Sequence, residues 1–275
     1  MKVHQVKIDF NVTDQIKRYV YVYLIEGKYC YLIDSGVAGC QHIIIERIHE
    51  IGKELSDLRG IFLTHAHPDH IGTAAWFKEQ TGCKIYASKG EMPWIEDIDL
   101  QFKERPIPNF YKLAGKSVAI DQQVKDGDEL ALDEAFSFKV IGTKGHSIDE
   151  VSYKAEDSLF IGDSVPVKGD IPIYVDCNES IRSLNRIKSE KSCKWFYPAW
   201  DYTYDSSTVL DKIEDANHLI HLIDLTVKKS QKKMDDKSVI VNSVCEILHN
   251  LRLADNPLFA RTIESHMDLR RFSCL

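Results

Sequence analysis

The chain has 275 residues, of which 44% are hydrophobic and 28% are charged, and its formal net charge is −7. These proportions are typical of a folded globular protein, and they exclude a disordered chain, a collagen-like repeat and a coiled coil. The acidic balance argues against non-specific binding to nucleic acid or to an anionic membrane. The length fits one large domain, or one domain with a small appendage.

No segment is typical of a membrane span or an export signal. The longest apolar runs, such as 43–45, are far shorter than the roughly 20 residues that cross a bilayer. Residues 1–10 alternate polar and apolar side chains, unlike a signal peptide. The seven cysteines are scattered and form no Cys-x-x-Cys pair, which predicts buried, reduced thiols. We therefore expect a cytoplasmic protein.

The first part of the chain alternates strands and helices, which favours a layered α/β fold. Hydrophobic periodicity predicts strands over 3–10, 19–25, 29–33, 59–63 and 84–87, and helices over 40–53 and 71–81.

Residues 89–116 are rich in proline and aromatic side chains, and we interpret them as a loop-and-helix insertion that covers a site. Its aromatic residues are a candidate apolar wall for a substrate. The alternative is a lid that packs on itself without touching a ligand. The aromatic residues in question are Trp94, Phe102, Phe110 and Tyr111.

The remaining chain is predicted to contain strands over 117–120, 136–141, 151–154, 158–161 and 194–197, and helices over 179–189, 207–227, 238–250 and 257–272. The lysine-rich segment 228–237 is interpreted as a solvated linker, and a nucleic-acid-binding patch is the alternative. We therefore expect a catalytic domain over 1–230 and a helical C-terminal appendage over 231–275.

Three histidines and one aspartate fall within six residues, directly after the apolar run 61–63. His65 and His67 alternate, so they face the same way on an extended segment. Asp69 and His70 follow Pro68 and can turn toward a second, displaced point. Imidazole and carboxylate are ligands for zinc and similar divalent ions, so the pattern suits two neighbouring metal ions. The alternative is a polar loop whose histidines are incidental.

This segment resembles the HxHxDH signature of the metallo-β-lactamase-fold hydrolase superfamily. The resemblance continues in order through Gly145-His146-Ser147, which is similar to the third metal histidine of the family, and Gly162-Asp163-Ser164, which is similar to its bridging aspartate. Upstream, Asp34 matches the aspartate at a strand end that supports the site from behind the ligands. The resemblance covers roughly residues 5–225 and implies an α/β fold, a four-layer αββα sandwich.

The resemblance also implies two sets of metal ligands: His65, His67 and His146 for one ion, and Asp69, His70 and Asp163 for the other, with Asp163 bridging. Zinc is the first expectation for both divalent ions, and iron or manganese are the alternatives. A shared water or hydroxide between two such ions attacks a carbonyl group. Asp69 is a candidate to accept or transfer a proton while it binds metal.

The pattern departs from the family after the next strand, where most members have a last metal histidine in a Pro-Gly-His-Gly setting. Here the stretch is Pro198-Ala199-Trp200-Asp201. Asp201 could supply a carboxylate ligand instead, and the alternative is that it caps the following helix or forms an ion pair. His218 and His221, three residues apart on a predicted helix, are expected to pack or face solvent.

Tyr174 lies in the segment 171–176, which follows the Gly162-Asp163 element closely. In lactone-cleaving relatives a tyrosine near the metals assists the carbonyl oxygen, so Tyr174 is a candidate catalytic residue. The alternative is an aromatic residue of the core or of the rim of the site.

The resemblance thus implies a metal-dependent hydrolase of an ester-like bond in a small molecule, such as a lactone or a thioester. The alternative is a phosphodiesterase or nuclease of the same fold, which the negative net charge disfavours. An electron-transfer module is disfavoured because His67 is intact, and a β-lactamase proper because no export signal is present. We expect a small-molecule substrate and neither nucleic acid nor membrane as partner, and leave a homodimer open.

Overall fold

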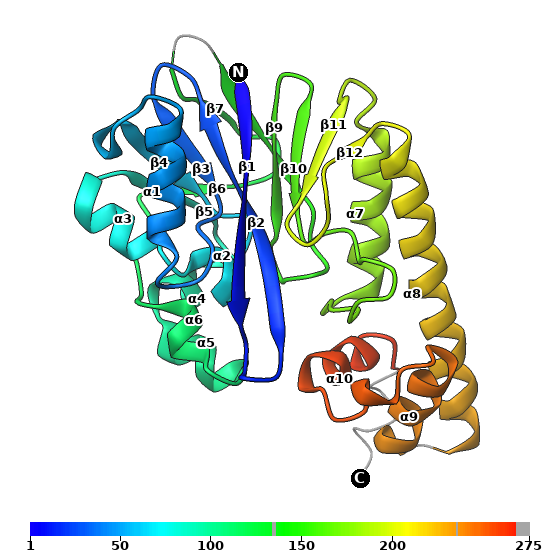
Figure 1. Ribbon diagram of the computed structural model, residues 1–275. Helices are drawn as coiled ribbons and strands as arrows, with labels where there is room; N and C mark the ends of the chain where they lie inside the picture. Colours follow the sequence, from blue (N-terminus) through cyan, green and yellow to red (C-terminus); the bar gives the residue numbers. More distant parts are fainter. Residues whose placement is uncertain (134–135, 235, 268–275) are drawn as a thin grey trace.

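The computed structural model describes residues 1–133, 136–234 and 236–267, and it contains two six-stranded sheets packed between two layers of helices (Figure 1). The first sheet has the strand order β1 (Lys2–Asn11), β2 (Lys17–Glu26), β3 (Cys30–Ile33), β4 (Leu58–Phe62), β5 (Lys84–Ser88) and β6 (Gln122–Val124). The second has the order β12 (Tyr204–Asp205), β11 (Trp195–Pro198), β10 (Ser158–Gly162), β9 (Val151–Ala155), β8 (Ser137–Gly142) and β7 (Glu129–Ala131). The expected αββα sandwich is confirmed.

Side chains alternate between the two faces of each strand, and this period of two builds two cores from one sequence. In β2, Val22 and Leu24 pack beneath the outer helices, while Tyr23 and Ile25 lie between the sheets. In β10, Phe160 is buried between the sheets, whereas its neighbours along the strand pack against the helices of the second sheet. Aromatic side chains make up half of the buried residues described between the two sheets.

Each sheet is covered on its outer face by helices (Figure 1). The helices of the first half are α1 (Gln41–Glu50), the 3₁₀ turn η1 (Leu55–Asp57), α2 (Pro68–Ile71) and α3 (Ala74–Thr81), so the segment expected as one helix over 71–81 forms parts of two. The second sheet is covered by α7 (Cys177–Ser189) and α8 (Thr208–Lys233).

The predicted insertion folds into three short helices: α4 (Met92–Glu96), α5 (Ile98–Glu104) and α6 (Phe110–Ala114). The strand expected over 117–120 is wrong, because β6 begins only at Gln122. The backbone N–H groups of Val118 and Ile120 instead donate to Ile95 and Glu96 of α4. This segment therefore ties the insertion to the body of the molecule.

The linker expected over 228–237 is also wrong in its first part, because α8 continues to Lys233. It is followed by α9 (Lys237–Ile247), the 3₁₀ turn η2 (Leu251–Leu253) and α10 (Pro257–Glu264), which pack around the end of α8 (Figure 1). The expected boundary at residue 230 thus falls inside a helix, and the division into two domains stays a prediction. The helix expected over 257–272 ends at Glu264, and residues 268–272 lie outside the described part.

Among the residues that the structure describes, no helix is long and apolar enough to cross a membrane. The cysteines of this part, Cys30, Cys40, Cys83, Cys177, Cys193 and Cys245, are buried and free.

Candidate metal centre and adjoining cavity

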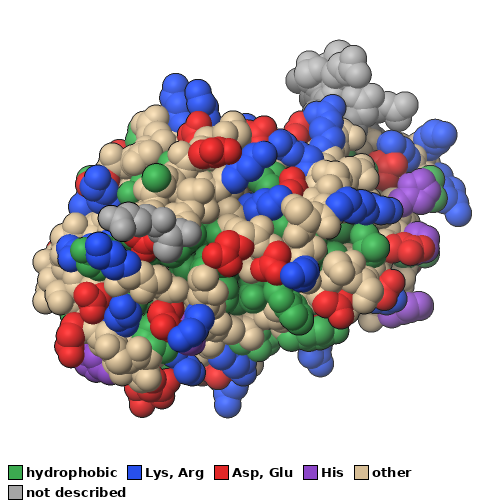
Figure 2. Space-filling view, turned by 90° about the horizontal axis from the view of Figure 1, so that it is seen from above, with side chains coloured by type: hydrophobic (Ala, Val, Ile, Leu, Met, Phe, Trp, Pro, Cys, Tyr) green, Lys and Arg blue, Asp and Glu red, His purple; other side chains and the backbone are tan. Residues whose placement is uncertain are grey.

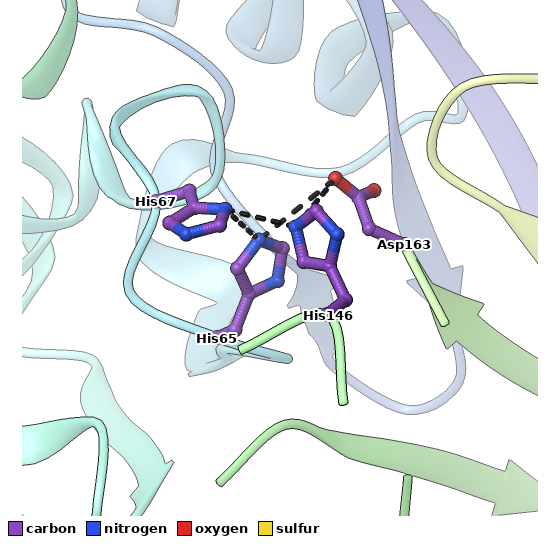
Figure 3. A group of neighbouring side chains, drawn as sticks. All are labelled: His65, His67, His146 and Asp163. Carbon is purple, nitrogen blue, oxygen red and sulfur yellow. Dashed lines mark hydrogen bonds and ion pairs between the residues drawn. The ribbon is translucent and has the colours of Figure 1, made fainter. Parts of the chain in front are cut away.

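Three strand ends bring together three histidines and one aspartate. His65 and His67 follow β4, His146 follows β8, and Asp163 follows β10. Figure 3 shows these four side chains pointing toward one another. The three histidines are almost fully buried, with 0% to 6% of their surface exposed. Residues far apart in the sequence therefore form one compact cluster.

The nitrogen atoms of the cluster are close enough to share one cation. His67 Nδ1 lies 2.9 Å from both His65 Nε2 and His146 Nε2 (Figure 3). Asp163 Oδ2 lies 3.3 Å from His146 Nε2 and 3.9 Å from His65 Nε2. Lone pairs directed at one another over such distances repel, unless a proton or a metal ion lies between them. This donor set is one that zinc binds in proteins.

Hydrogen bonds on the far side of two rings determine which nitrogen faces the cluster. His146 Nδ1 lies 2.7 Å from the carbonyl oxygen of Ile173, to which it can only donate. His65 Nδ1 lies 3.0 Å from Thr64 Oγ1, whose own hydrogen is donated to Asp34. We therefore assign the proton to Nδ1 in both rings, which leaves each Nε2 free to bind a metal ion. Burial lowers the pKa of His65 and His67 well below the usual value and that of His146 to about 4, so the three rings are neutral at pH 7.

A second set of ligand atoms adjoins the first. His70 Nε2 lies 3.6 Å from Asp69 Oδ2 and 3.5 Å from Asp163 Oδ2. Asp69 Oδ2, His70 Nε2 and Asp163 Oδ1 are buried and have no hydrogen-bond partner within the described chain. Buried polar atoms are rarely left unpaired, so these three atoms fit a second cation.

The pKa shifts of His70 and Asp69 also favour a cation at this second set of atoms. Burial acts to lower the pKa of His70, but the neighbouring carboxylates Asp163, Asp34 and Asp69 raise it well above the usual value. Without metal the ring is therefore protonated, and a divalent ion would replace this proton. Burial raises the pKa of Asp69.

Asp34, the residue that the resemblance suggests as a support for the ligands, lies behind the second set. It has a left-handed backbone with φ of +59°, and its carboxylate accepts from His70 Nδ1 at 2.8 Å and from the backbone N–H and hydroxyl of Thr64. Gly162 lies next to Asp163 and also has a positive φ. A Cβ atom at Gly162 would lie 2.7 Å from Glu150 Oε1, so only glycine brings β10 this close.

Two buried glutamates support the cluster, and neither is part of the predicted site. Glu150 accepts from the backbone N–H of Asp163 at 2.9 Å. Glu91 accepts from Ala66 N and from Ser147 Oγ, and so joins the loop of His65 and His67 to the loop of His146. Burial raises the pKa of both glutamates. Glu150 follows His146 closely in the sequence, but Glu91 lies in the insertion and carries no pattern that identifies it.

The structure does not bring Asp201 or Tyr174 to the cluster. Asp201 Oδ2 accepts from Tyr204 at 2.8 Å and from Lys212 Nζ at 2.7 Å, which is the ion pair that was the alternative. Tyr174 is 1% exposed, and its hydroxyl is hydrogen-bonded to His266 Nε2 at 2.8 Å. These contacts account for both side chains without a role in metal binding or catalysis.

The structure also shows what surrounds Trp200, His218 and His221. Burial acts to raise the pKa of Asp163, but His70 and His146, with a smaller contribution from the nearby indole of Trp200, lower it overall. The Nε1 atom of Trp200 has no hydrogen-bond partner among the described residues. His218 and His221 are exposed on α8, as expected.

A cavity of about 400 Å³ adjoins the cluster and is open to His67, Asp69, His146 and Asp163. Its wall is mostly apolar and is built from the β1–β2 loop, the insertion, the segment after β10 and the C-terminal helices. The wall includes Phe10, Ile107, Leu113, Val165, Ile171, Trp200 and Leu258, together with Arg18, Arg105 and Arg252.

The aromatic residues of the insertion do not form this wall, so that hypothesis is wrong. Phe102 and Tyr111 are 37% and 48% exposed and contact each other, with ring centroids 5.1 Å apart. Phe110 is buried in the core of the first sheet, and Trp94 donates from its indole to Glu104. Only the alternative, packing of these rings within the insertion and the core, agrees with the structure.

Sequence comparison connects the chain to one large family. The model of the Metallo-beta-lactamase superfamily matches residues 16–194. A hydroxyacylglutathione hydrolase from Hyphomonas neptunium is 29% identical over 183 residues, which are 66% of this chain and 62% of that protein. A protein named Probable metallo-hydrolase from Methanocaldococcus jannaschii is 26% identical over 183 residues, which are 64% of this chain and 84% of that protein. The match thus spans less than two thirds of the Hyphomonas relative.

Comparison with solved structures extends over nearly the whole chain. A metallo-beta-lactamase family protein from Thermus thermophilus has a TM-score of 0.71 at 16% identity, covering 98% of this chain and 94% of its own. A beta-lactamase domain protein from Burkholderia ambifaria has a TM-score of 0.73 at 16% identity, covering 99% and 87%. At these identities the similarity establishes the fold alone.

Proposed function

Because this chain belongs to the metallo-beta-lactamase superfamily, we propose that it is a metal-dependent hydrolase that cleaves an ester-like bond, such as a thioester or lactone, in a small molecule. The observation that carries this proposal is the convergence of three buried imidazoles and Asp163 beside a largely apolar cavity of about 400 Å³. A cavity of this size accepts a small acyl compound. Relatives named hydroxyacylglutathione hydrolases, which by that name act on a glutathione thioester, support the ester-like class.

Two metal ions are part of the proposal. The ligand sets are His65, His67 and His146 for one ion, and Asp69, His70 and Asp163 for the other. When bound, such ions lower the pKa of a water molecule and polarise a carbonyl group at neutral pH. Zinc suits the imidazole-rich set, and the second set, with two carboxylates, would also accept iron or manganese.

The residues of the chain then have separate tasks. Asp34 and Thr64 orient His70 and His65, so their ligand nitrogens are preorganised. The apolar wall excludes water from the acyl part of the substrate. Asp69 borders the cavity, so its carboxylate is placed to accept or transfer a proton while it binds metal.

The nuclease alternative has less support. On the face drawn in Figure 2, lysine and arginine side chains are interspersed with aspartate and glutamate, and they form no continuous basic stripe there. The net charge is −7, whereas phosphate backbones are bound through an excess of basic side chains.

The test is elemental analysis of the purified protein, followed by assay of the same sample on thioesters, lactones, phosphodiesters and β-lactams. We expect up to two divalent ions per chain and turnover of a thioester or lactone. The double substitution His65→Ala and His67→Ala should abolish both metal content and turnover, whereas His218→Ala, at an exposed position on α8, should change neither. Stoichiometric metal in the double variant would contradict the assignment of the metal ligands. Faster cleavage of phosphodiesters than of thioesters and lactones would favour the nuclease alternative.

A further inference from the structure

Arg105 is a buried cation without a partner in the wall of the cavity. It follows directly after α5, is 7% exposed and lines the cavity with His67 and Asp69. Its backbone N–H donates to Gln101, but its guanidinium makes no hydrogen bond or ion pair with any described residue. A guanidinium has five N–H donors, and those of Arg105 are not among the fully buried unpaired atoms, so they face the cavity instead of an acceptor in the protein.

A buried guanidinium without a partner is unusual among the arginines near this cavity. Arg18 forms a two-point contact with Asp170, with N–O distances of 2.9 and 2.8 Å. Arg261 of α10 donates to the carbonyl oxygen of Glu104, directly before Arg105. Arg252, at the exposed rim, lines the cavity beside the exposed Asp255. Arg105 alone of these is nine-tenths buried and unpaired.

The charges around Arg105 do not supply a permanent partner. Burial lowers its pKa to about 10, so the side chain stays charged at neutral pH. Asp69 and Asp163 act on it electrostatically without a hydrogen bond, and both are assigned above to the metal ligands. Glu91 is already used by three hydrogen bonds to the loops of the cluster. With metal ions bound, the surroundings of Arg105 become more positive.

We propose that Arg105 binds an anionic oxygen group of the substrate, a carboxylate or a phosphate, while the neighbouring cluster acts on the ester-like bond. A planar guanidinium fork pairs with such groups through two parallel hydrogen bonds. The substrate is then a small acyl compound with one anionic group and an apolar part that contacts the cavity wall. This inference rests on the proposed function and makes Arg105 a specificity-determining residue.

The kinetic test compares substrates that differ only in charge. One pair is a glutaryl thioester and the same thioester with the free carboxylate replaced by a carboxamide, and the other places carboxylate or carboxamide on the thiol side. In the wild-type protein, kcat/KM should favour the carboxylate by tenfold or more in at least one pair. Arg105→Gln should abolish this preference through a 10- to 100-fold loss on the anionic substrate, mainly in KM. Arg105→Lys keeps the positive charge but not the planar guanidinium, so it should retain part of the preference for the carboxylate substrate.

Two controls separate binding from folding. Arg182→Gln removes an exposed arginine that pairs with Glu179 on α7, and it should leave the preference unchanged. Metal content of Arg105→Gln should equal that of the wild type, and its thermal stability should be no lower, because the substitution removes a largely buried charge that has no partner. An unchanged carboxylate preference in Arg105→Gln, or no preference in either pair, would overturn the inference.

A direct binding measurement distinguishes failure of this inference from failure of the proposed function. Glutarate, inorganic phosphate and neutral glutaramide are titrated into the metal-loaded protein by calorimetry. We expect glutarate or phosphate to bind at least tenfold more weakly to Arg105→Gln, and glutaramide not to bind. Equal anion affinity in both proteins would show binding elsewhere and overturn the role of Arg105. If no ester-like substrate is hydrolysed, the proposed function fails, and this titration still decides the question of Arg105.

Discussion

The carboxylate of Asp34 holds two histidines in place, one directly and one through Thr64. It accepts from His70 at 2.8 Å and from the hydroxyl of Thr64, which in turn accepts from His65. Asp34 has a left-handed backbone, which aspartate tolerates better than most residues. The carboxylate of Asp34 thus accepts from a backbone N–H group and from a histidine of the candidate metal site, and only the resemblance to the family's strand-end aspartate identified it in the sequence.

Asp201 shows how a single contact changes an expectation. With its carboxylate bound to Lys212 and Tyr204, we expect Asp201→Asn to leave the number of metal ions per chain unchanged. The substitution should lower the free energy of unfolding by about 1–3 kcal/mol, because it weakens a partly buried ion pair and its hydrogen bonds. Elemental analysis and urea denaturation measure the two quantities. A drop in metal content from two ions to one would restore Asp201 as a ligand.

Residues in recognisable motifs, including His146 and Asp163, could be predicted from the sequence, whereas single residues that only the fold brings to the site could not. The motif of His65, His67, Asp69 and His70 is recognised from the spacing of these residues. Glu91 and Arg105 are a single carboxylate and a single guanidinium in an irregular segment, and their importance follows from burial and from partners in other loops. No periodicity or spacing carries that information.

At the scale of elements, α8 explains why the lysine-rich segment is not a linker. Val227 and Gln231 continue the buried face set by Ile223, at helical spacing, while the lysines between them face solvent. Lysine and glutamine are also good helix formers. The segment is polar in composition, yet its first part belongs to an amphipathic helix. The apolar side of this helix packs against α9 and α10.

A buried histidine that follows α10 contacts the segment 171–176, next to Thr262 of α10, which also bonds to this segment. His266 Nε2 is hydrogen-bonded to the hydroxyl of Tyr174 at 2.8 Å, and its Nδ1 lies 3.3 Å from Asp224. Burial lowers the pKa of His266 below its usual value, although Asp224 opposes the shift. Between the folded pKa and the unfolded value near 6.5, the unfolded chain therefore binds more protons than the folded one.

This difference predicts the sign of a pH effect. Stability contributed by His266 is fully present above the unfolded pKa and is lost as the pH falls toward the folded pKa. The free energy of unfolding of the wild type, minus that of His266→Gln, should thus be smaller at pH 5.0 than at pH 7.5. Urea denaturation at both pH values measures it, and the other histidines cancel in the difference. An equal or larger difference at pH 5.0 would contradict the prediction.

For the whole molecule, the order of motifs along the chain predicted the sandwich, but the cavity required the tertiary structure. The residues of the cluster all follow strands, and the two sheets end side by side, so ligands from both halves meet at one edge. The cavity wall, by contrast, combines segments from the β1–β2 loop to residues 252–258. The C-terminal helices thus contribute to the candidate active site as well as to the core around α8.

The continuity of α8 predicts how the molecule unfolds. Ile220 packs under the second sheet and Ile223, one turn later, packs against α9 and α10, so loss of either core should destabilise the other. The four tryptophans lie between residues 76 and 200, so their fluorescence reports mainly the sandwich, although Trp200 also borders the cavity, whereas far-ultraviolet circular dichroism reports all helices.

We expect the two signals to change at the same urea concentration, and Ile223→Ala to lower both midpoints by removing about 2–4 kcal/mol of stability. Leu225→Ala, at a position that is 52% exposed on the same helix, is the matched control and should change neither midpoint measurably. Loss of part of the helical signal before any change in fluorescence would show that residues 231–275 fold separately. A shared transition would instead mean that the C-terminal wall of the cavity is as stable as the sheets that position the histidines.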